Sequence, residues 1–247
     1  MDPMLEVDHI GRKFGQLVAV RDVSFNVREG EIRGLIGPNG SGKTTTFNMI
    51  SGFLAPTSGK VRLGGEVISG KTPHAVAARG LVRTFQLTSL YRDMSVLENV
   101  EIGHHLRRGS RTNPVADVRE SALEILDFLG LSEARDMPAR MLPAGTQRTL
   151  SIATALAAAP KLLLLDEPLA GLNPSEKAGI VAKMRLLRER GVTVLLVEHD
   201  VKSVLSVCDR VVVINFGERI FDGAAGDVSK DPQVIKAYLG SSGKHDA

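Results

Sequence analysis

A glycine-rich loop at residues 37–44 constrains this chain more than any other stretch of its sequence. The apolar run 32–36 comes directly before the loop, and residues 45–53 continue it as a predicted helix. The loop reads Gly37, Pro38, Asn39, Gly40, Ser41, Gly42, Lys43 and Thr44. This is the pattern G-x-x-x-x-G-K-[ST], which lies between a strand and a helix where phosphates bind. Chance produces it in a chain of this length on the order of one time in a hundred, so a turn without a ligand is the weaker interpretation.

Each residue type in the loop suits an anionic ligand. Glycines lack a Cβ, so the backbone can curl and direct successive N–H groups at one anion. The helix that begins near Gly42 adds its partial positive charge at the same point, and Thr45 belongs to the start of that helix. The Lys43 ammonium can contact the β- and γ-phosphates, and the Thr44 hydroxyl can ligate Mg²⁺. The sequence therefore predicts that residues 37–45 bind a nucleotide.

Two carboxylates follow a second buried segment. Four leucines at 162–165 suit a central strand buried on both faces, and Asp166 and Glu167 come next. Asp166 is suited to hold Mg²⁺, directly or through water, opposite Thr44. Glu167 is suited to orient or deprotonate the water that attacks the γ-phosphate. An acidic turn at a strand end is the alternative, and it explains less beside the phosphate loop.

Three further residues each allow two interpretations. Phe14 is either a core residue, which the residues alone favour, or a flat face on which an adenine stacks. Gln86 ends a strand predicted at 81–86, where a glutamine is usually only solvated. His199 follows the predicted strand 192–197, which should lie beside the leucine strand. His199 is therefore either structural or directed into the same crevice as the two carboxylates.

Composition limits the remaining possibilities. The 247 residues, 43% of them hydrophobic, can bury one large core. The apolar runs are shorter than the ~18 residues of a membrane span, and the N-terminus lacks the basic and apolar regions of a secretory signal. A single cysteine, Cys208, excludes an internal disulfide and suits a reducing compartment. The net charge of +3 is small and not clustered, so nucleic acid is not an expected partner.

The hydrophobic pattern divides the chain into a core and an inserted helical block. Alternating residues at 5–7 and 18–27 predict half-buried strands. Helical spacing dominates from residue 91 to 160, with a helix predicted at 149–159 and an exposed loop at 109–114. We expect one domain, 1–247, composed of a nucleotide-binding core with an antiparallel β subdomain (1–88 and 160–240), a helical subdomain (89–159) and a loose tail (241–247). Asn173 is expected to cap a helix that begins at Pro174.

Taken in order, these motifs resemble those of ATP-binding cassette domains, and the resemblance covers nearly the whole chain. It rests on the phosphate loop, Gln86, Leu-Asp-Glu-Pro at 165–168, Gly-Leu-Asn at 171–173 and His199. The resemblance implies that Phe14 stacks on adenine and that Gln86 approaches Mg²⁺ where the domain meets its membrane partner. It also implies that His199 contacts the γ-phosphate, so that Glu167, His199 and Gln86 are the catalytic residues. Residues 171–173 would cross a dimer interface, with Asn173 in place of a more usual aspartate.

One motif departs from the family pattern. Where the family has Leu-Ser-Gly-Gly-Gln, this chain has Leu142, Pro143, Ala144, Gly145 and Thr146. Gly145 still allows a close approach of the backbone to a phosphate, and the following helix still directs its N-terminus there. Pro143 has neither an N–H nor a hydroxyl, so the usual serine contact is absent. The resemblance implies that these five residues, here called the signature segment, bind ATP held by a partner chain.

The family implies a fold and a reaction. The fold is α/β: a P-loop NTPase with a RecA-like parallel core, an N-terminal antiparallel β subdomain and an inserted α-helical subdomain. The reaction is ATP hydrolysis with ATP and Mg²⁺ in a head-to-tail dimer of two cassettes, identical or different. The implied partners are transmembrane permease subunits and, indirectly, a solute-binding protein. The chain would then be peripheral, at the cytoplasmic face of the inner membrane.

A narrower resemblance concerns the transported solute. Residues 12–15, 35–44, 83–86, 97–100 and 234–240 resemble the ATPase subunit of branched-chain amino acid importers. The Ala-Tyr-Leu-Gly ending at 237–240 is the most specific of these matches. Importers of urea, short amides or other amino acids are alternatives. So is a soluble cassette acting on DNA or ribosomes, although such proteins usually carry a coiled-coil insert or a second cassette. A phosphate-loop kinase would leave Gln86 and His199 unexplained.

Overall fold

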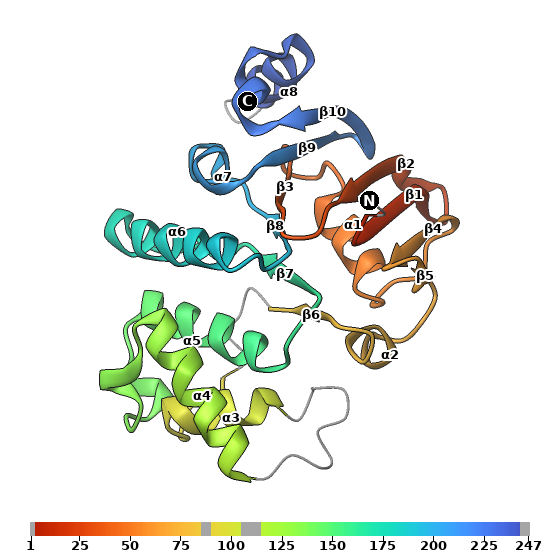
Figure 1. The fold of residues 1–247 in the computed structure, drawn as a ribbon. Coiled ribbons are helices and arrows are strands. Elements are labelled where there is room, and N and C mark those ends of the chain that lie inside the picture. Colours follow the sequence, from red (N-terminus) through yellow and green to blue (C-terminus); the bar gives the residue numbers. More distant parts are fainter. Residues whose placement is uncertain (1–2, 85–89, 105–114, 243–247) are drawn as a thin grey trace.

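The strands that the structure describes form one large sheet (Figure 1). The computed structural model describes residues 3–84, 90–104 and 115–242, so Gln86 and the predicted loop 109–114 lie outside the described residues. The strands are β1 (Leu5–Phe14), β2 (Leu17–Val27), β3 (Ile32–Ile36), β4 (Ser58–Leu63), β5 (Glu66–Val67), β6 (Leu81–Arg83), β7 (Leu162–Asp166), β8 (Val194–Val197), β9 (Arg210–Asn215) and β10 (Glu218–Ala224). Their spatial order is β5-β4-β1-β2-β10-β9-β3-β8-β7-β6.

The helices surround this sheet. They are α1 (Lys43–Ile50), α2 (Pro73–Ala77), α3 (Val96–Gly103), α4 (Val115–Leu129), α5 (Ala144–Ala157), α6 (Pro174–Glu189), α7 (Val201–Val207) and α8 (Pro232–Ser242), with 3-10 turns η3 (Ser132–Ala134), η4 (Ala139–Met141) and η5 (Ala225–Lys230). Helices α3, α4 and α5 gather at the bottom of Figure 1, beyond β6 and β7. The predicted block of helices between strands is therefore present, and α8 closes the chain beside β10.

Two kinds of strand pairing divide the sheet. β3 pairs in parallel with both β8 and β9, and β7 pairs in parallel with β8 and β6. The carboxyl ends of β3, β7 and β8 therefore meet at one edge, where ligands bind in such sheets. β1 pairs antiparallel with β2 and β4, and one parallel pair, Glu218 with Asp22, links β10 to β2. The predicted α/β fold with a parallel core and an N-terminal antiparallel sheet is confirmed.

The phosphate loop rests on a core shared by both parts of the sheet. Every residue of β3 and β8 is buried, as central parallel strands require. Phe47 and Ile50 of α1 are 0% exposed. Their apolar cluster contains residues of both parts of the sheet, among them Leu5, Val7, Val23, Leu35, Leu164 and Val197. Burial of each large side chain contributes roughly 1.5–3 kcal/mol, so α1 is firmly held beneath the loop that begins it.

The bounds of several elements differ from the sequence prediction. α1 begins at Lys43, directly after Gly42 as predicted, but it ends at Ile50, three residues before the end of the predicted segment 45–53. β1 continues to Phe14, through residues predicted to connect two strands. Register shifts interrupt its pairing with β2 after Val7, and such irregularities break the alternation on which the prediction relied. α8 extends to Ser242, two residues into the predicted tail.

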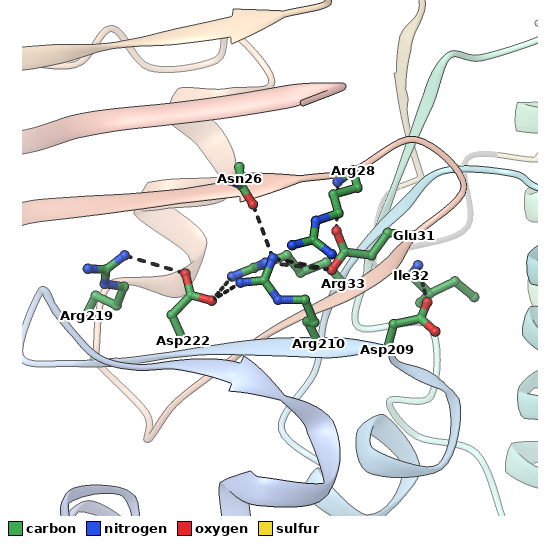
Figure 2. Close-up of polar contacts among 9 residues, drawn as sticks. All are labelled: Asn26, Arg28, Glu31, Ile32, Arg33, Asp209, Arg210, Arg219 and Asp222. Atoms are coloured by element: carbon green, nitrogen blue, oxygen red, sulfur yellow. Dashed lines mark hydrogen bonds and ion pairs between the residues drawn. The ribbon is translucent and has the colours of Figure 1, made fainter. Parts of the chain in front are cut away.

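A buried charge cluster ties β3 to β9 and β10 (Figure 2). Arg33 is 0% exposed and forms an ion pair with Asp222, while its Nη1 lies 3.7 Å from Glu31 Oε1. Arg210 Nη2 donates a hydrogen bond to Asp222 Oδ1 at 2.8 Å. Burial lowers the pKa of Arg33, and the charge of Asp222 opposes this effect. Losing one partner of such a buried pair costs about 3–5 kcal/mol, so we assign the cluster a structural role.

Candidate nucleotide-binding site

The phosphate loop has the backbone that its sequence predicts. Gly40 and Gly42 have φ values of 75° and 103°, a region that other residues adopt only at a cost. A Cβ at Gly42 would also come within 2.8 Å of the Ala19 carbonyl oxygen of β2. Among the described residues, no side chain caps the start of α1, so the first N–H groups of the helix are available to an anion.

Lys43 is already positioned by the loop. Its Nζ donates hydrogen bonds to the carbonyl oxygens of Gly37 at 2.7 Å and Pro38 at 2.9 Å, and the residue is 7% exposed. An ammonium has three hydrogens, so two are used here and one remains for a phosphate. Burial lowers the pKa of Lys43, while the negative charge of Glu167 raises it in part. Ser41 Oγ is buried without a hydrogen-bond partner among the described residues, which also fits a bound anion.

A cavity of about 370 Å³ opens over this loop. Its lining comes from three separate parts of the chain: residues 40–45 of the loop and α1, residues 17–19 and Arg21 of β2, and Phe216 in the turn between β9 and β10. Cavities of this size hold small-molecule ligands. The predicted site residues from Gly40 to Thr45 are therefore brought together around one space.

Asp166 lies at the end of β7, near the phosphate loop. Its Oδ2 accepts a hydrogen bond from Arg83 Nη2 at 2.6 Å. Arg83 Nη1 donates to Asn48 Oδ1 at 2.7 Å and to Ser51 Oγ at 2.9 Å, so this arginine joins the end of β7 to α1. The described residues contain no group of three His, Cys, Asp or Glu side chains that could hold a metal ion. The Asp166 carboxylate and the Thr44 hydroxyl are oxygen donors of the kind that Mg²⁺ takes together with substrate phosphates.

Glu167 and His199 lie at adjacent strand ends, as the sequence predicts. Glu167 has a φ of 45°, and its N–H donates to the Val197 carbonyl oxygen at 2.9 Å, which holds the turn against β8. Glu167 Oε2 lies 4.0 Å from His199 Nδ1. The parallel pairing of β7 with β8 places both side chains at the same edge of the sheet. Their catalytic roles remain predictions.

Glu198 connects the turn after Glu167 to the backbone at His199. Its carboxylate is buried, and Oε1 accepts a hydrogen bond from the Leu169 N–H at 2.7 Å. Oε2 accepts from the His199 N–H at 3.2 Å. Burial raises the pKa of Glu198, and these two backbone hydrogen bonds oppose the rise. The sequence pattern did not identify Glu198, because a carboxylate after a strand gives no sign of burial.

Phe14 is not a core residue, so the interpretation that the residues alone favour is wrong. The residue is 46% exposed, at the end of β1. The guanidinium carbon of Arg12 lies over its ring, 4.8 Å from the ring centroid. Phe14 does not line the cavity, although Leu17, its partner across the strand pair, does. Adenine stacking on Phe14 remains a prediction.

The signature segment is the start of a helix rather than a loop. Pro143 precedes α5, whose first turn contains Ala144, Gly145 and Thr146; the predicted helix began five residues later. The N–H of Gly145 donates to Glu176 Oε1 at 3.1 Å. A carboxylate of the same chain therefore occupies the anion position at the start of α5. None of the five segment residues lines the cavity.

The same glutamate completes the predicted cap of α6. Asn173 Oδ1 accepts from the Glu176 N–H at 3.0 Å, and Glu176 Oε2 accepts from the Asn173 N–H at 3.1 Å. The predicted capping role of Asn173 is confirmed. Glu176 thus links residues 171–173 to the signature segment through two backbone hydrogen bonds. The S/T/N-x-x-E capping pattern in the sequence could have predicted the contact of Glu176 with Asn173, but not its contact with Gly145.

Tyr238 of α8 is a further contact of the phosphate loop that the sequence did not reveal. Burial raises its pKa to about 12, and a hydrogen bond with the Gly37 backbone opposes the rise. The residue belongs to the Ala-Tyr-Leu-Gly ending, so the segment most specific for the narrower resemblance reaches the nucleotide site.

In the described residues, none of the helices is long and apolar enough to cross a membrane.

A family model described as ABC transporter matches residues 20–170, which include the phosphate loop and Asp166. The chain belongs to the ABC transporter family. This cassette is accordingly an ATP-binding protein and an ATPase, as its sequence motifs predict. A second family model, described as branched-chain amino acid ATP-binding cassette transporter, matches residues 218–244.

This ABC cassette is similar to known proteins over nearly its whole length. It is 42% identical to the high-affinity branched-chain amino acid transport ATP-binding protein BraF of Pseudomonas aeruginosa, over 97% of this chain and 99% of that protein. It is 37% identical to LivG of Escherichia coli, described as a protein of the same transport, over the same shares. It is also 37% identical to the lipopolysaccharide export ATP-binding protein LptB of Haemophilus influenzae, over 98% of this chain and 99% of that protein.

Solved structures agree with the fold. The ADP conformation of the ATP-binding cassette MJ1267 superposes with a TM-score of 0.87 at 33% identity, over 97% of this chain and 100% of that one. A dimeric post-hydrolysis state of the cassette MJ0796, bound to ADP and Pi, gives a TM-score of 0.77 at 26% identity, over 90% and 99%.

Proposed function

We propose that this ABC cassette drives the import of branched-chain amino acids. The observation that carries the proposal is the family match at residues 218–244, a segment separate from the general cassette motifs. Overall identity distinguishes the cargo only weakly, because LivG of Escherichia coli and LptB are each 37% identical to this chain and BraF is 42% identical. The matched segment includes α8, whose Tyr238 contacts the phosphate loop at Gly37.

We propose a separate role for each residue of the site. The backbone N–H groups of residues 37–45 and the Lys43 ammonium hold the triphosphate. Thr44 and Asp166 would hold Mg²⁺, which would supply positive charge beside the phosphates. Glu167 accepts a proton from the attacking water, and His199 contacts the γ-phosphate beside it. Arg83 and Glu198 keep Asp166 and the Glu167 turn in place through the hydrogen bonds described above. For Gln86 we propose the role that the family implies, which is to approach Mg²⁺. Gln86 lies outside the described residues.

We further propose that two cassettes pair head to tail on transmembrane permease subunits, as peripheral proteins of the cytoplasmic face. A helical subdomain, residues 89–159, presents the signature segment to the partner. Contacts near Gln86 would pass the motion to the permease, and a solute-binding protein would deliver the cargo. The support is membership of the family itself.

Uptake by a strain that lacks this gene tests the proposed cargo. We expect the wild-type chain to restore uptake of labelled leucine, isoleucine and valine, and the Lys43→Ala chain not to restore it. Restored uptake of urea alone would show that the cargo is different. Purification of the tagged chain from detergent-solubilised membranes provides the second measurement. Two membrane subunits should accompany it, whereas co-purification of ribosomes or DNA would contradict the importer assignment.

Mixing two inactive variants tests whether the signature segment acts on the partner's nucleotide. Lys43→Ala damages a chain's own phosphate loop, and Ala144→Asp places a carboxylate at the exposed start of α5. An acidic residue in the first helical turn favours the helix, so the second variant should remain folded. In a mixed dimer both lesions meet in one site and the other site is intact. An equal mixture should therefore recover about a quarter of wild-type turnover, from half the dimers with one working site each.

The mixing experiment needs proof that mixed dimers form. Cross-linking in the presence of the membrane subunits supplies it, because isolated cassettes can pair weakly. A covalently tethered dimer with one broken site is the matched control for cooperation between sites. Activity in the tethered dimer together with none in a proven mixture would contradict action on the partner chain. Gly145→Asp is less suitable than Ala144→Asp, because a Cβ at Gly145 would lie 3.0 Å from Glu176 Cγ.

A further inference from the structure

Phe216 stands at a turn position that suits other residues. The two-residue turn between Asn215 of β9 and Glu218 of β10 has φ values of 47° at Phe216 and 78° at Gly217. Two positive φ values are typical of the type I′ hairpin turn, for which Asn-Gly and Asp-Gly are preferred. A bulky residue in this region is an outlier. The Phe216 ring is also 78% exposed. Neither turn geometry nor burial explains a phenylalanine here.

The turn is held firmly against the phosphate loop. The Gly217 N–H donates to the Ser41 carbonyl oxygen at 2.8 Å, and its own carbonyl oxygen accepts from the Arg21 N–H at 2.9 Å. A Cβ at Gly217 would come within 2.8 Å of the Ala19 carbonyl oxygen, so the packing is close. Phe216 therefore has a defined position between the loop and β2, although its side chain is exposed.

The cavity has two chemically different parts. Residues 40–45 provide backbone N–H groups, hydroxyls and the Lys43 ammonium, which suit phosphates. Leu17, Val18, Ala19 and Phe216 provide apolar surface. The triphosphate uses the first part, so the base and ribose of the same molecule must meet the second.

We propose that Phe216 forms an apolar wall for the nucleoside half of bound ATP, and this inference rests on the proposed role of residues 37–45 as the ATP-binding loop. An aromatic ring offers a nucleoside a large, rigid surface at low entropic cost. Phe14 alone does not meet this need in the structure, because it lies outside the lining of the cavity and Arg12 covers one face of its ring.

Binding of two ligands by the full chain tests the proposal. Phe216→Ala should raise the Kd of Mg²⁺–ATP roughly 2- to 12-fold, which is the ~0.5–1.5 kcal/mol of an aromatic contact converted at 1.4 kcal/mol per tenfold change. The Kd of Mg²⁺–tripolyphosphate, which has no nucleoside, should stay unchanged. Phe14→Ala, measured in parallel, shows whether both aromatic residues contact the nucleoside. A selective loss of ATP in both variants still supports the proposal for Phe216.

A second variant separates binding from folding. Phe216→Asn suits the positive φ of the turn, so the Tm of the nucleotide-free chain should rise or stay the same. The same variant should weaken ATP as Phe216→Ala does. Opposite signs for stability and affinity would exclude a merely structural role for the ring.

The chain contains no tryptophan, so one can be introduced as a specific probe. Phe216→Trp should keep ATP affinity near wild type, and its emission should change on addition of ATP but not of tripolyphosphate. Phe128→Trp, in α4 and outside the lining of the cavity, is the matched control and should not respond to either ligand.

Equal losses of both ligands in Phe216→Ala would overturn the proposal, since Phe216 would then act only through the phosphate loop. Unchanged ATP affinity in Phe216→Ala would overturn it as well. Failure of the proposed function looks different: uptake of branched-chain amino acids is not restored, while purified wild-type chain still binds ATP.

Discussion

Glu167→Gln is expected to lower ATP turnover by about 10²–10⁴-fold, the typical contribution of a positioned base, without lowering ATP affinity. Glutamine has the shape of glutamate but cannot accept the proton of the attacking water. The backbone should not move, because the Glu167 N–H bonds to the Val197 carbonyl oxygen independently of the side chain. In the proposed head-to-tail pair, hydrolysis separates the two cassettes, so the variant should also accumulate as an ATP-bound dimer. Steady-state turnover, ATP titration and size-exclusion chromatography measure the three effects.

A charge-matched control accompanies this variant. Asp227→Asn also removes one carboxylate, from an exposed ion pair with Lys230 in η5, and should leave turnover unchanged. Wild-type turnover in Glu167→Gln would remove this residue from the mechanism. A loss of ATP affinity equal to the loss of turnover would instead mean that Glu167 shapes the binding site rather than the chemical step.

Lys43→Met is expected to abolish most ATP binding while the nucleotide-free chain stays folded. Charge-assisted hydrogen bonds contribute roughly 1.5–3 kcal/mol each, so each lost phosphate contact weakens ATP by about 10- to 150-fold. Burial already disfavours the charged form of Lys43, as its lowered pKa indicates. Replacing the ammonium also removes its hydrogen bonds to the Gly37 and Pro38 carbonyl oxygens, so the Tm of the nucleotide-free chain should fall modestly while the chain remains folded.

Thermal unfolding with and without Mg²⁺–ATP measures both parts of this expectation. A ligand at 100 times its Kd stabilises the folded state by about 2.7 kcal/mol, so ATP should raise the Tm of the wild type clearly. The same ATP concentration should leave the Tm of Lys43→Met almost unchanged. Lys230→Met, at the exposed partner of Asp227, is the control and should respond as the wild type does. An unchanged response in Lys43→Met would contradict the role of the loop.

The parallel core and the main site could be predicted because their signals are local. The buried runs of β3, β7 and β8 lack alternation, which indicates central strands. A motif with clear chemistry lies at or directly after the carboxyl end of each strand, so a shared site could be predicted there. The cap at Asn173 likewise depends on two residues, Asn173 and Glu176, three positions apart. Such features need no knowledge of distant contacts.

Features that depend on distant contacts could not be predicted. Arg83 of β6 contacts Asp166 of the neighbouring strand β7, 83 residues away in the sequence, and Glu176 of α6 contacts Gly145 of α5. Phe14 is apolar, as core residues are, yet it lies at the end of β1 and is 46% exposed. The start of α5 was missed because Pro143 and Gly145 discourage a helix prediction, although proline is well tolerated at a helix start.

The position of β3 between β8 and β9 has a consequence for synthesis of the chain. Both neighbours of β3 come from the last quarter of the sequence, and Ile32 bonds to Asp209, 177 residues away. Ribosomes add about 5–20 residues per second, so β3 waits on the order of ten to thirty seconds for its neighbours. During that interval the nascent phosphate loop lacks the strands on both sides of β3. It also lacks the hydrogen bond from the Gly217 N–H to Ser41 and the contact with Tyr238. The first motif to leave the ribosome is therefore among the last parts of the molecule to become functional.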